Sequence, residues 1–172
     1  LTVRVRCFVV TAEIEYLNDF IEEVEVTKTR DKAVENLEIL LEGNDSAALD
    51  NLNAALVLSN ELVDVENKAM RLMLEAEGYD MTGIPAEIAE LELDPDELEM
   101  SPEELEKKAQ TMVFDNNYMH YKDRIRENVN LCTQALIRSS SQELEEASAN
   151  LSILVNIQTL LTIIFFLIVL SI

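Results

Sequence analysis

The sequence has few of the residues that end helices or build turns. It contains three glycines, three prolines and no tryptophan, and only 5% of its 172 residues are aromatic. Such a composition favours long helices over a turn-rich β fold. Two cysteines and a single histidine make neither a disulfide framework nor a zinc-ligand pattern. We therefore predict an all-α protein without a metal site or a bound cofactor.

Positive charge is also scarce. The chain has 13 Lys and Arg against 34 Asp and Glu, which gives a formal net charge of −21. This balance argues against nucleic-acid binding, which needs clustered bases, and against docking on anionic lipid. The hydrophobic content of 48% is normal for a folded protein, so the acidity does not indicate disorder.

Sequence patterns of catalysis are missing as well. We find no glycine-rich phosphate loop, no nucleophile–base pair and no paired catalytic carboxylates. We predict that these residues are not an enzyme. A catalytic output domain, such as a kinase or a diguanylate cyclase, would lie outside this chain.

Apolar residues recur at three- and four-residue steps along most of the chain, as they do on amphipathic helices. The spacing predicts helices over 11–42, 46–77, 102–138 and 141–172, with "SSSQ" at 139–142 ending the third. Ser101, Pro102 and Glu104 form a capping box with proline at the first helical position. Helices of similar length joined by short turns predict an antiparallel up-down-up-down four-helix bundle.

One long connection, residues 78–101, separates the second and third predicted helices. From Glu77 to Glu106 there are twelve acidic residues and no basic one. We therefore expect a long acidic connection at one end of the bundle.

The chain ends on "ILVNIQTLLTIIFFLIVLSI", residues 153–172, which carries no charge. Its length matches the ~20 residues that cross a bilayer as a helix. The alternative is a buried bundle helix, but a bundle helix needs one polar face, and the stretch around Phe165 and Phe166 is apolar on every side. We predict a transmembrane helix at 153–172 and a bundle domain at 11–152. Residues 1–10 are a candidate for the end of a preceding membrane segment, although Arg4 and Arg6 fit a hydrocarbon core poorly.

Three stretches carry a resemblance to a known class of proteins: "TRDKAVENLEILLEGND", "ALVLSNELVDVENKAMRLMLEAEGYD" and "SPEELEKKAQTMVFDNNYMHYKDRIRENVNLC". They are similar to the extracytoplasmic four-helix-bundle sensor domains of bacterial transmembrane receptors. That class includes chemoreceptors, sensor histidine kinases and membrane diguanylate cyclases, and the resemblance covers residues 11–172. It implies a dimeric receptor in the bacterial cell membrane, with the bundle on the extracytoplasmic side. No binding residue of the class can be placed here by motif.

The stretch "NNYMHYKDRIREN" places aromatic, hydrogen-bonding and cationic groups within two helical turns. Tyr118, Tyr121 and Arg124 are candidate ligand-binding residues, since such a mixture can line a small-molecule pocket. In the alternative interpretation the tyrosines belong to the core with their hydroxyls at its edge, and Arg124 is solvated.

Polar residues also interrupt the apolar seams of the first two predicted helices. Arg30 lies in the first, and Asn60 and Asn67 lie in the second. Because buried polar groups need partners, these three could form half of an anion site. The alternative is a polar layer that sets the helix register, as in coiled coils.

Two functional hypotheses follow. The first is an extracytoplasmic sensory, ligand-binding module of a bacterial transmembrane signal-transduction protein, which relays a helix displacement across the membrane. The alternative is a tail-anchored helical bundle with a structural or interaction role and no small-molecule ligand. We expect a homodimer, because unequal helix lengths leave apolar faces uncovered.

Overall fold

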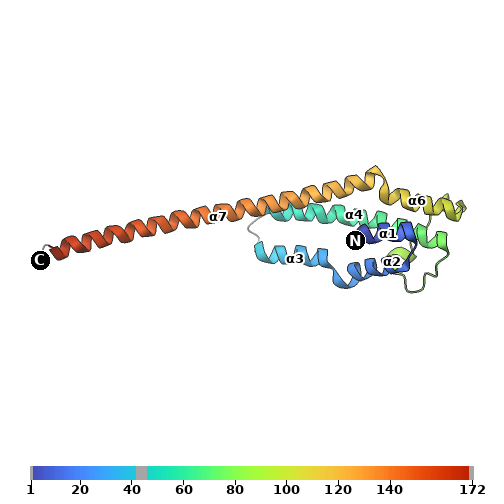
Figure 1. Ribbon diagram of the computed structural model, residues 1–172, viewed down its shortest axis with the longest axis horizontal. Helices are drawn as coiled ribbons and strands as arrows, with labels where there is room; N and C mark the ends of the chain where they lie inside the picture. Colours follow the sequence, from blue (N-terminus) through green and yellow to red (C-terminus); the bar gives the residue numbers. More distant parts are fainter. Residues whose placement is uncertain (1, 42–45, 171–172) are drawn as a thin grey trace.

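The computed structural model describes the backbone of residues 2–41 and 46–170 and the side chains of residues 2–41 and 47–164. Every regular element within these residues is helical, which confirms the predicted all-α class. The predicted turn at 43–45 lies outside the described residues. The elements, in chain order (Figure 1), are α1 (Thr2–Thr11), α2 (Ile14–Ile21), η1 (Glu22–Thr27), α3 (Thr29–Leu41), α4 (Ser46–Glu77), α5 (Ala86–Ala89), η2 (Glu97–Glu99), α6 (Pro102–Phe114) and α7 (Asn116–Leu170).

Helix α4 lies at the centre of the fold. It has the bounds that the sequence predicts, and it packs against α1, α3, α5, α6 and α7. Three successive residues, Leu72, Met73 and Leu74, are almost fully buried, although they point in directions about 100° apart. The C-terminal half of α4 is therefore covered over most of its circumference, and Glu61, Asp64 and Glu75 lie on the exposed strip that remains.

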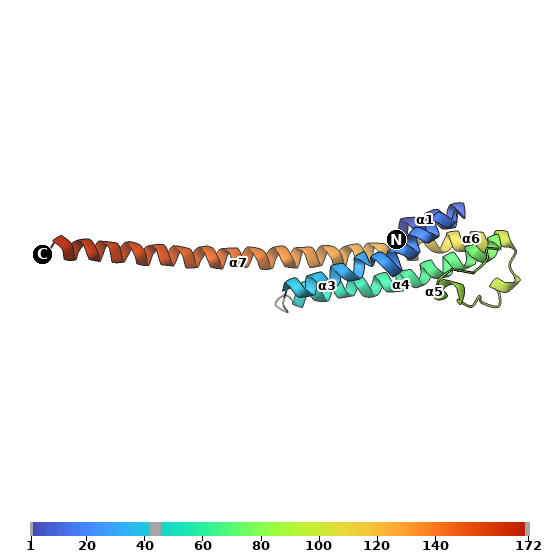
Figure 2. The ribbon, with the colours of Figure 1, turned by 90° about the horizontal axis from the view of Figure 1, so that it is seen from below.

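The prediction of one continuous helix over 11–42 is wrong. Helix α1 ends at Thr11, and Ala12 adopts a left-handed conformation with φ 57°. The chain then reverses, so that α1 and α2 lie side by side and both contribute to the core (Figure 2). Val5, Phe8 and Val9 of α1 are fully buried in that core. Whether residues 1–10 also continue a preceding membrane segment stays a prediction.

Whereas the break at Ala12 delays the start of the predicted first helix, a second interruption divides that helix in two. Residues Glu22–Thr27 form a π-helix, which ends at Lys28 with a left-handed φ of 49°. Since Ala12 and Lys28 are not glycine, the sequence carries no conspicuous signal for either break. Helix α3 continues beyond Lys28 along α4.

The predicted third helix has the right start and the wrong end. Ser101 accepts a hydrogen bond from the Glu104 backbone, and the Glu104 carboxylate accepts one from the Ser101 backbone, so the capping box is confirmed. The helix ends at Phe114, however, and Asp115 has an extended backbone. Asp115 Oδ1 then accepts a hydrogen bond of 2.7 Å from the Tyr118 backbone N–H, which caps the start of α7.

The break at Asp115 resets the buried face. Before it, the buried residues Leu105, Ala109 and Val113 follow one another at steps of four. After it the next buried residue is Tyr118, five positions on, while Met119 is 40% exposed. The step of five from Val113 to Tyr118, in place of four, arises because the extended residue Asp115 inserts one non-helical position between the two helices.

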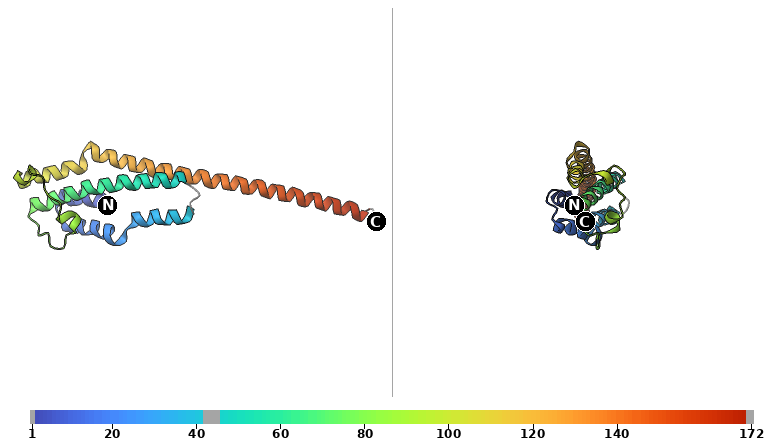
Figure 3. Two further views of the ribbon diagram at one scale, coloured as in Figure 1. Left: turned by 180° about the vertical axis from the view of Figure 1, so that it is seen from behind. Right: turned by 90° about the vertical axis from the view of Figure 1, so that its right-hand side faces the viewer.

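The predicted fourth helix does not fold back. Helix α7 runs unbroken through 139–142 to Leu170 and leaves the other helices behind (Figure 3). Every described side chain from Ser140 to Ile164 is exposed. The predicted up-down-up-down four-helix bundle, with its domain at 11–152, is therefore not confirmed. Serine lowers helix propensity only slightly, so three serines in a row do not stop a long helix.

Replacing Ala12 by glycine tests the left-handed turn. We expect Ala12→Gly to raise the free energy of unfolding by up to ~1.5 kcal/mol. Relief of the left-handed strain, roughly 1–2 kcal/mol, exceeds the added freedom of the unfolded chain, about 0.5–1 kcal/mol. Urea unfolding followed by circular dichroism measures the difference.

Ala33→Gly in the exposed face of α3 is the matched control, because there glycine only weakens a helix and should cost about 1 kcal/mol. Equal losses in both variants would contradict the conformation described for Ala12.

Candidate functional site

The structure has two clefts that contain sequence-predicted site residues. The first, here called the α5 cleft, has a volume of about 440 Å³. It lies where α2 and η1, α4 and α5 meet, and Asn60 and Asn67 are among its lining residues. Its lining residues are Phe20, Ile21, Val24, Glu25, Lys28, Asn60, Val63, Asp64, Asn67, Pro85, Glu87 and Ile88.

The second, here called the α7 cleft, has a volume of about 450 Å³ and lies at the break between α6 and α7. It brings together the other predicted group, Tyr118, Tyr121 and Arg124. Tyr118 is only 1% exposed, however, so it offers a ligand almost no surface. The remaining lining residues are Val65, Met112, Asp115, Asn117 and His120.

Arg30 lies in neither cleft. Its Nη1 donates a hydrogen bond of 2.9 Å to Ser59 Oγ, and its Nε lies 3.8 Å from Asp31 Oδ1. The structure thus brings Asn60 and Asn67 together but gives Arg30 other partners, so the three do not line one anion site.

Beneath the α7 cleft lies a buried polar network that the sequence did not indicate. The Tyr118 hydroxyl donates a hydrogen bond of 2.5 Å to Glu66 Oε1 on α4. Burial raises the pKa of Glu66 above its ordinary value, although the bond from Tyr118 and the charges of Lys122 and Arg6 oppose this. Burial, followed by the charge of Glu66, raises the pKa of the Tyr118 hydroxyl.

Arg6 joins α1 to the same network. Its guanidinium lies over the rings of Phe114 and Tyr118, at 4.7 Å and 4.9 Å from the ring centroids. Its Nε also donates to the backbone carbonyl of Val113 at 2.9 Å. Cation–π contacts and a backbone hydrogen bond explain how an arginine fits beside an apolar core. The network ties α1, α4, α6 and α7 together.

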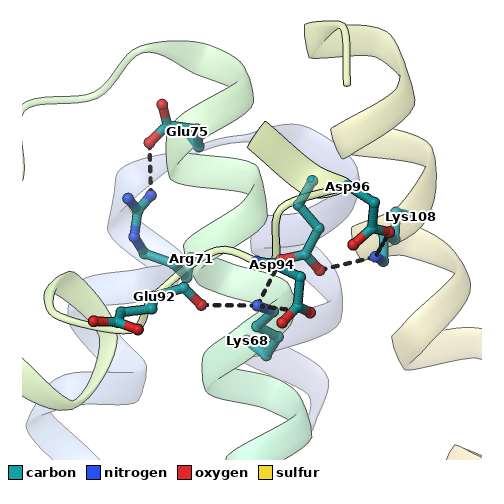
Figure 4. Close-up of polar contacts among 8 residues, drawn as sticks. Lys68, Arg71, Glu75, Glu92, Asp94, Asp96 and Lys108 are labelled. Carbon is teal, nitrogen blue, oxygen red and sulfur yellow. Dashed lines mark hydrogen bonds and ion pairs between the residues drawn. The ribbon is translucent and has the colours of Figure 1, made fainter. Parts of the chain in front are cut away.

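A second buried carboxylate, Glu97, attaches the acidic connection to α4 and α6. Glu97 is 1% exposed and accepts from Lys68 of α4 at 2.6 Å and from Lys108 of α6 at 2.9 Å. Figure 4 shows both lysines directed at the connection, where Asp94 and Asp96 lie beside them at 3.5 Å. The acidic run is thus anchored by two bases that come from the flanking helices.

These bonds set the ionisation of Glu97. Burial alone would raise its pKa, but the hydrogen bonds from Lys68, Lys108 and the Asp94 backbone outweigh burial and lower the pKa from 4.5 to about 2. A carboxylate that stays ionised and paired in this way has a structural role: it holds the connection against the two flanking helices. At 1% exposure it offers a substrate almost no surface.

Among the residues that the structure describes, no group of three or more His, Cys, Asp or Glu side chains is arranged to hold a metal ion. Sequence reasoning missed Arg6, Glu66 and Glu97. For Arg6 the available signal was a charged residue within an otherwise apolar stretch, which was interpreted as a poor membrane residue, whereas Glu66 and Glu97 lie among other polar residues and carry no such signal.

The exposed end of α7 is the most unusual surface of the fold. The segment Pro102–Ile164 contains an 18-residue window with a mean hydropathy of 1.5, none of it buried by the described chain. Leu154, Leu160 and Leu161 are each about 60% exposed. By length and composition this helix can cross a membrane. The side chains of Phe165 and Phe166 lie outside the described residues.

No protein-family model, curated protein or solved structure matches this chain. The predicted sensor-domain resemblance is neither supported nor contradicted by these comparisons.

Replacing Glu97 tests the anchoring of the connection. Glu97→Gln removes the charge and leaves the two lysines without their buried partner, so we expect a loss of about 1–3 kcal/mol in the free energy of unfolding at pH 7. Because the folded pKa lies below the unfolded one, this stabilisation is complete above pH 4.5 and disappears as the pH falls toward 2. The difference between wild type and variant should therefore shrink in urea titrations between pH 5 and about 2.5.

Glu99→Gln, an exposed carboxylate of the same η2 turn, is the control and should change stability by less than about 0.5 kcal/mol at either pH. A pH-independent loss in Glu97→Gln would show that packing, not charge, accounts for its effect.

Proposed function

We propose that this chain is an extracytoplasmic sensory module of a bacterial transmembrane signalling protein. In this proposal the helices of residues 11–152 receive the signal, and 153–172 carries it through the membrane. Signal passes as a displacement of α7 toward an output domain beyond these residues. The chain itself performs no catalysis, and two copies form the working receptor.

One observation carries the proposal: a single helix, α7, joins the packed domain to an exposed apolar segment without a break. An apolar window that buries no surface against its own chain is unfavourable in water and favourable in lipid. A rigid helix that is packed at one end and embedded at the other couples the two environments, because packed helices shift as units.

The position of α4 supports the same interpretation. Asn60, Asp64 and Asn67 line the α5 cleft, whereas Glu66 on the same helix holds Tyr118 of α7. A ligand that moves α4 at the α5 cleft would therefore act on α7 through a buried hydrogen bond and its surrounding packing.

Arginines placed in the apolar end of α7 test the membrane assignment. The double variant Leu161→Arg/Ile164→Arg should lose co-flotation with phosphatidylcholine vesicles, because an arginine near the bilayer centre costs about 2.5–3.5 kcal/mol. Vesicle flotation on a density gradient, with the bound fraction measured by immunoblot, reports the loss.

Leu144→Arg/Leu151→Arg carries the same added charge on the exposed part of α7 before residue 153, and it should float like the wild type. Flotation of both double variants would contradict a span at 153–172.

The relay itself is tested by changing the phase of α7. The chain through Ile172 is joined to a histidine-kinase output domain, and one to four alanines are inserted after Ser140. Each alanine rotates the packed domain by about 100° relative to the span, so kinase autophosphorylation should vary with a period near 3.6 residues. Two alanines should change output most, and four should nearly restore it.

The same alanines inserted after Thr82, in the connection, should leave output unchanged. Kinase output that ignores insertions in α7, together with normal vesicle flotation, would favour the alternative of an anchored interaction protein without a relay.

A further inference from the structure

The α5 cleft has an apolar floor with a defined shape. Phe20 and Ile88 are almost fully buried, at 2% and 1% exposure, and Ile21, Val24 and Val63 are partly buried around them. Apolar clefts of a few hundred Å³ with a small number of polar groups are the usual form of small-molecule sites. The floor favours a ligand with an apolar body.

Charge at the rim of this cleft is strongly unequal. Glu25 of η1, Asp64 of α4 and Glu87 of α5 line it from three separate elements, and Lys28 is the one basic residue among the lining residues. Within the described part of the chain, the side chains of these four residues make no ion pair or hydrogen bond with one another or with any other group. The cleft therefore has two uncompensated negative charges, which disfavour an anion and favour a cation.

Two amides complete the chemistry. Asn60 and Asn67 line the same cleft from one face of α4, seven residues apart, and Asn67 is half-buried. Neither side chain has a hydrogen-bond partner in the described residues. Amide oxygens accept hydrogen bonds from an ammonium group, which has three donors and no acceptor capacity.

We propose that the α5 cleft binds a small primary amine, with its apolar body on the floor formed by Phe20, Val63 and Ile88 and its ammonium group among Glu25, Asp64 and Glu87. The inference rests on the proposed function for its biological meaning, because the amine would be the sensed ligand. It differs from the sequence-based expectation of an anion site, which required Arg30 at this position.

The α7 cleft does not compete for this ligand. Its lining includes Arg124 alongside Asp115, so it lacks the excess of carboxylates. Tyr118, its largest aromatic group, is buried and bonded to Glu66. A cationic ligand therefore has a better match in the α5 cleft.

Three probes with the same phenyl body and different head groups test the proposal. Isothermal titration of the detergent-solubilised full chain is made with 2-phenylethylamine, 2-phenylethanol and 3-phenylpropanoate. We expect the amine to bind at least tenfold more tightly than the alcohol, and the carboxylate to show no binding. Equal binding of all three, or tighter binding of the carboxylate, would overturn the proposal.

Variants locate the site. Asp64→Asn/Glu87→Gln should weaken amine binding at least tenfold and leave alcohol binding unchanged. Glu61→Gln/Glu90→Gln is the matched control, because it removes two exposed carboxylates from α4 and from the end of α5 that do not line the cleft. An equal effect of both double variants would show a non-specific charge effect and would reject this cleft.

Side-chain amide resonances give a readout that needs no variant. Addition of 2-phenylethylamine should shift the Asn60 and Asn67 amide signals and leave Asn117, in the α7 cleft, unchanged. Failure of amine binding with intact vesicle flotation and intact kinase relay would reject the ligand and leave the proposed function standing. Amine binding without vesicle flotation or kinase relay would reject the proposed function and leave the amine site standing.

Discussion

The burial of α4 over most of its circumference is the constraint on which the fold depends. Because Leu72, Met73 and Leu74 point in directions about 100° apart and are all buried, neighbouring helices must pack on several sides of α4. Helix α1 and the pair α6–α7 supply most of that cover, and α5 adds Ile88 from the connection. Each of these elements is short or exposed elsewhere, so its position follows from contact with α4 more than from its own helix propensity.

Two buried carboxylates then fix elements that apolar packing alone would leave free to slide. Glu66 holds Tyr118 and so sets α7 against α4, and Glu97 holds Lys68 and Lys108 and so sets the connection against α4 and α6. The two have opposite pKa directions, raised for Glu66 and lowered for Glu97, because one meets a neutral hydroxyl and the other meets two cations. Directional bonds of this kind specify register, which non-directional burial does not.

Sequence reasoning succeeded where a single local rule decides the structure. The bounds of α4 follow from its apolar spacing, and the start of α6 follows from the Ser101–Glu104 capping box. It failed at Ala12, Lys28 and Asp115, where residues without a strong breaking tendency leave the helix because tertiary packing requires it. For the same reason the predicted site residues do not form one site. Spacing along one helix indicates which residues share a face. The burial of Tyr118 and the partners of Arg30, however, depend on helices far away in sequence.

The projecting part of α7 has a mechanical consequence. From Ser140 to Leu170 the helix extends about 45 Å beyond its last packed turn, at 1.5 Å per residue. Over such a lever arm, a tilt of about 5° at the packed end moves the far end by roughly 4 Å, whereas the side chains that cause the tilt move only a fraction of an ångström. Because the far end of α7 moves several times further than the packed side chains, a small rearrangement of the packed helices is enough to displace it. The same geometry means that thermal bending of the projecting part of α7 also displaces its far end at random. A second α7 helix packed alongside would stiffen it and reduce these fluctuations.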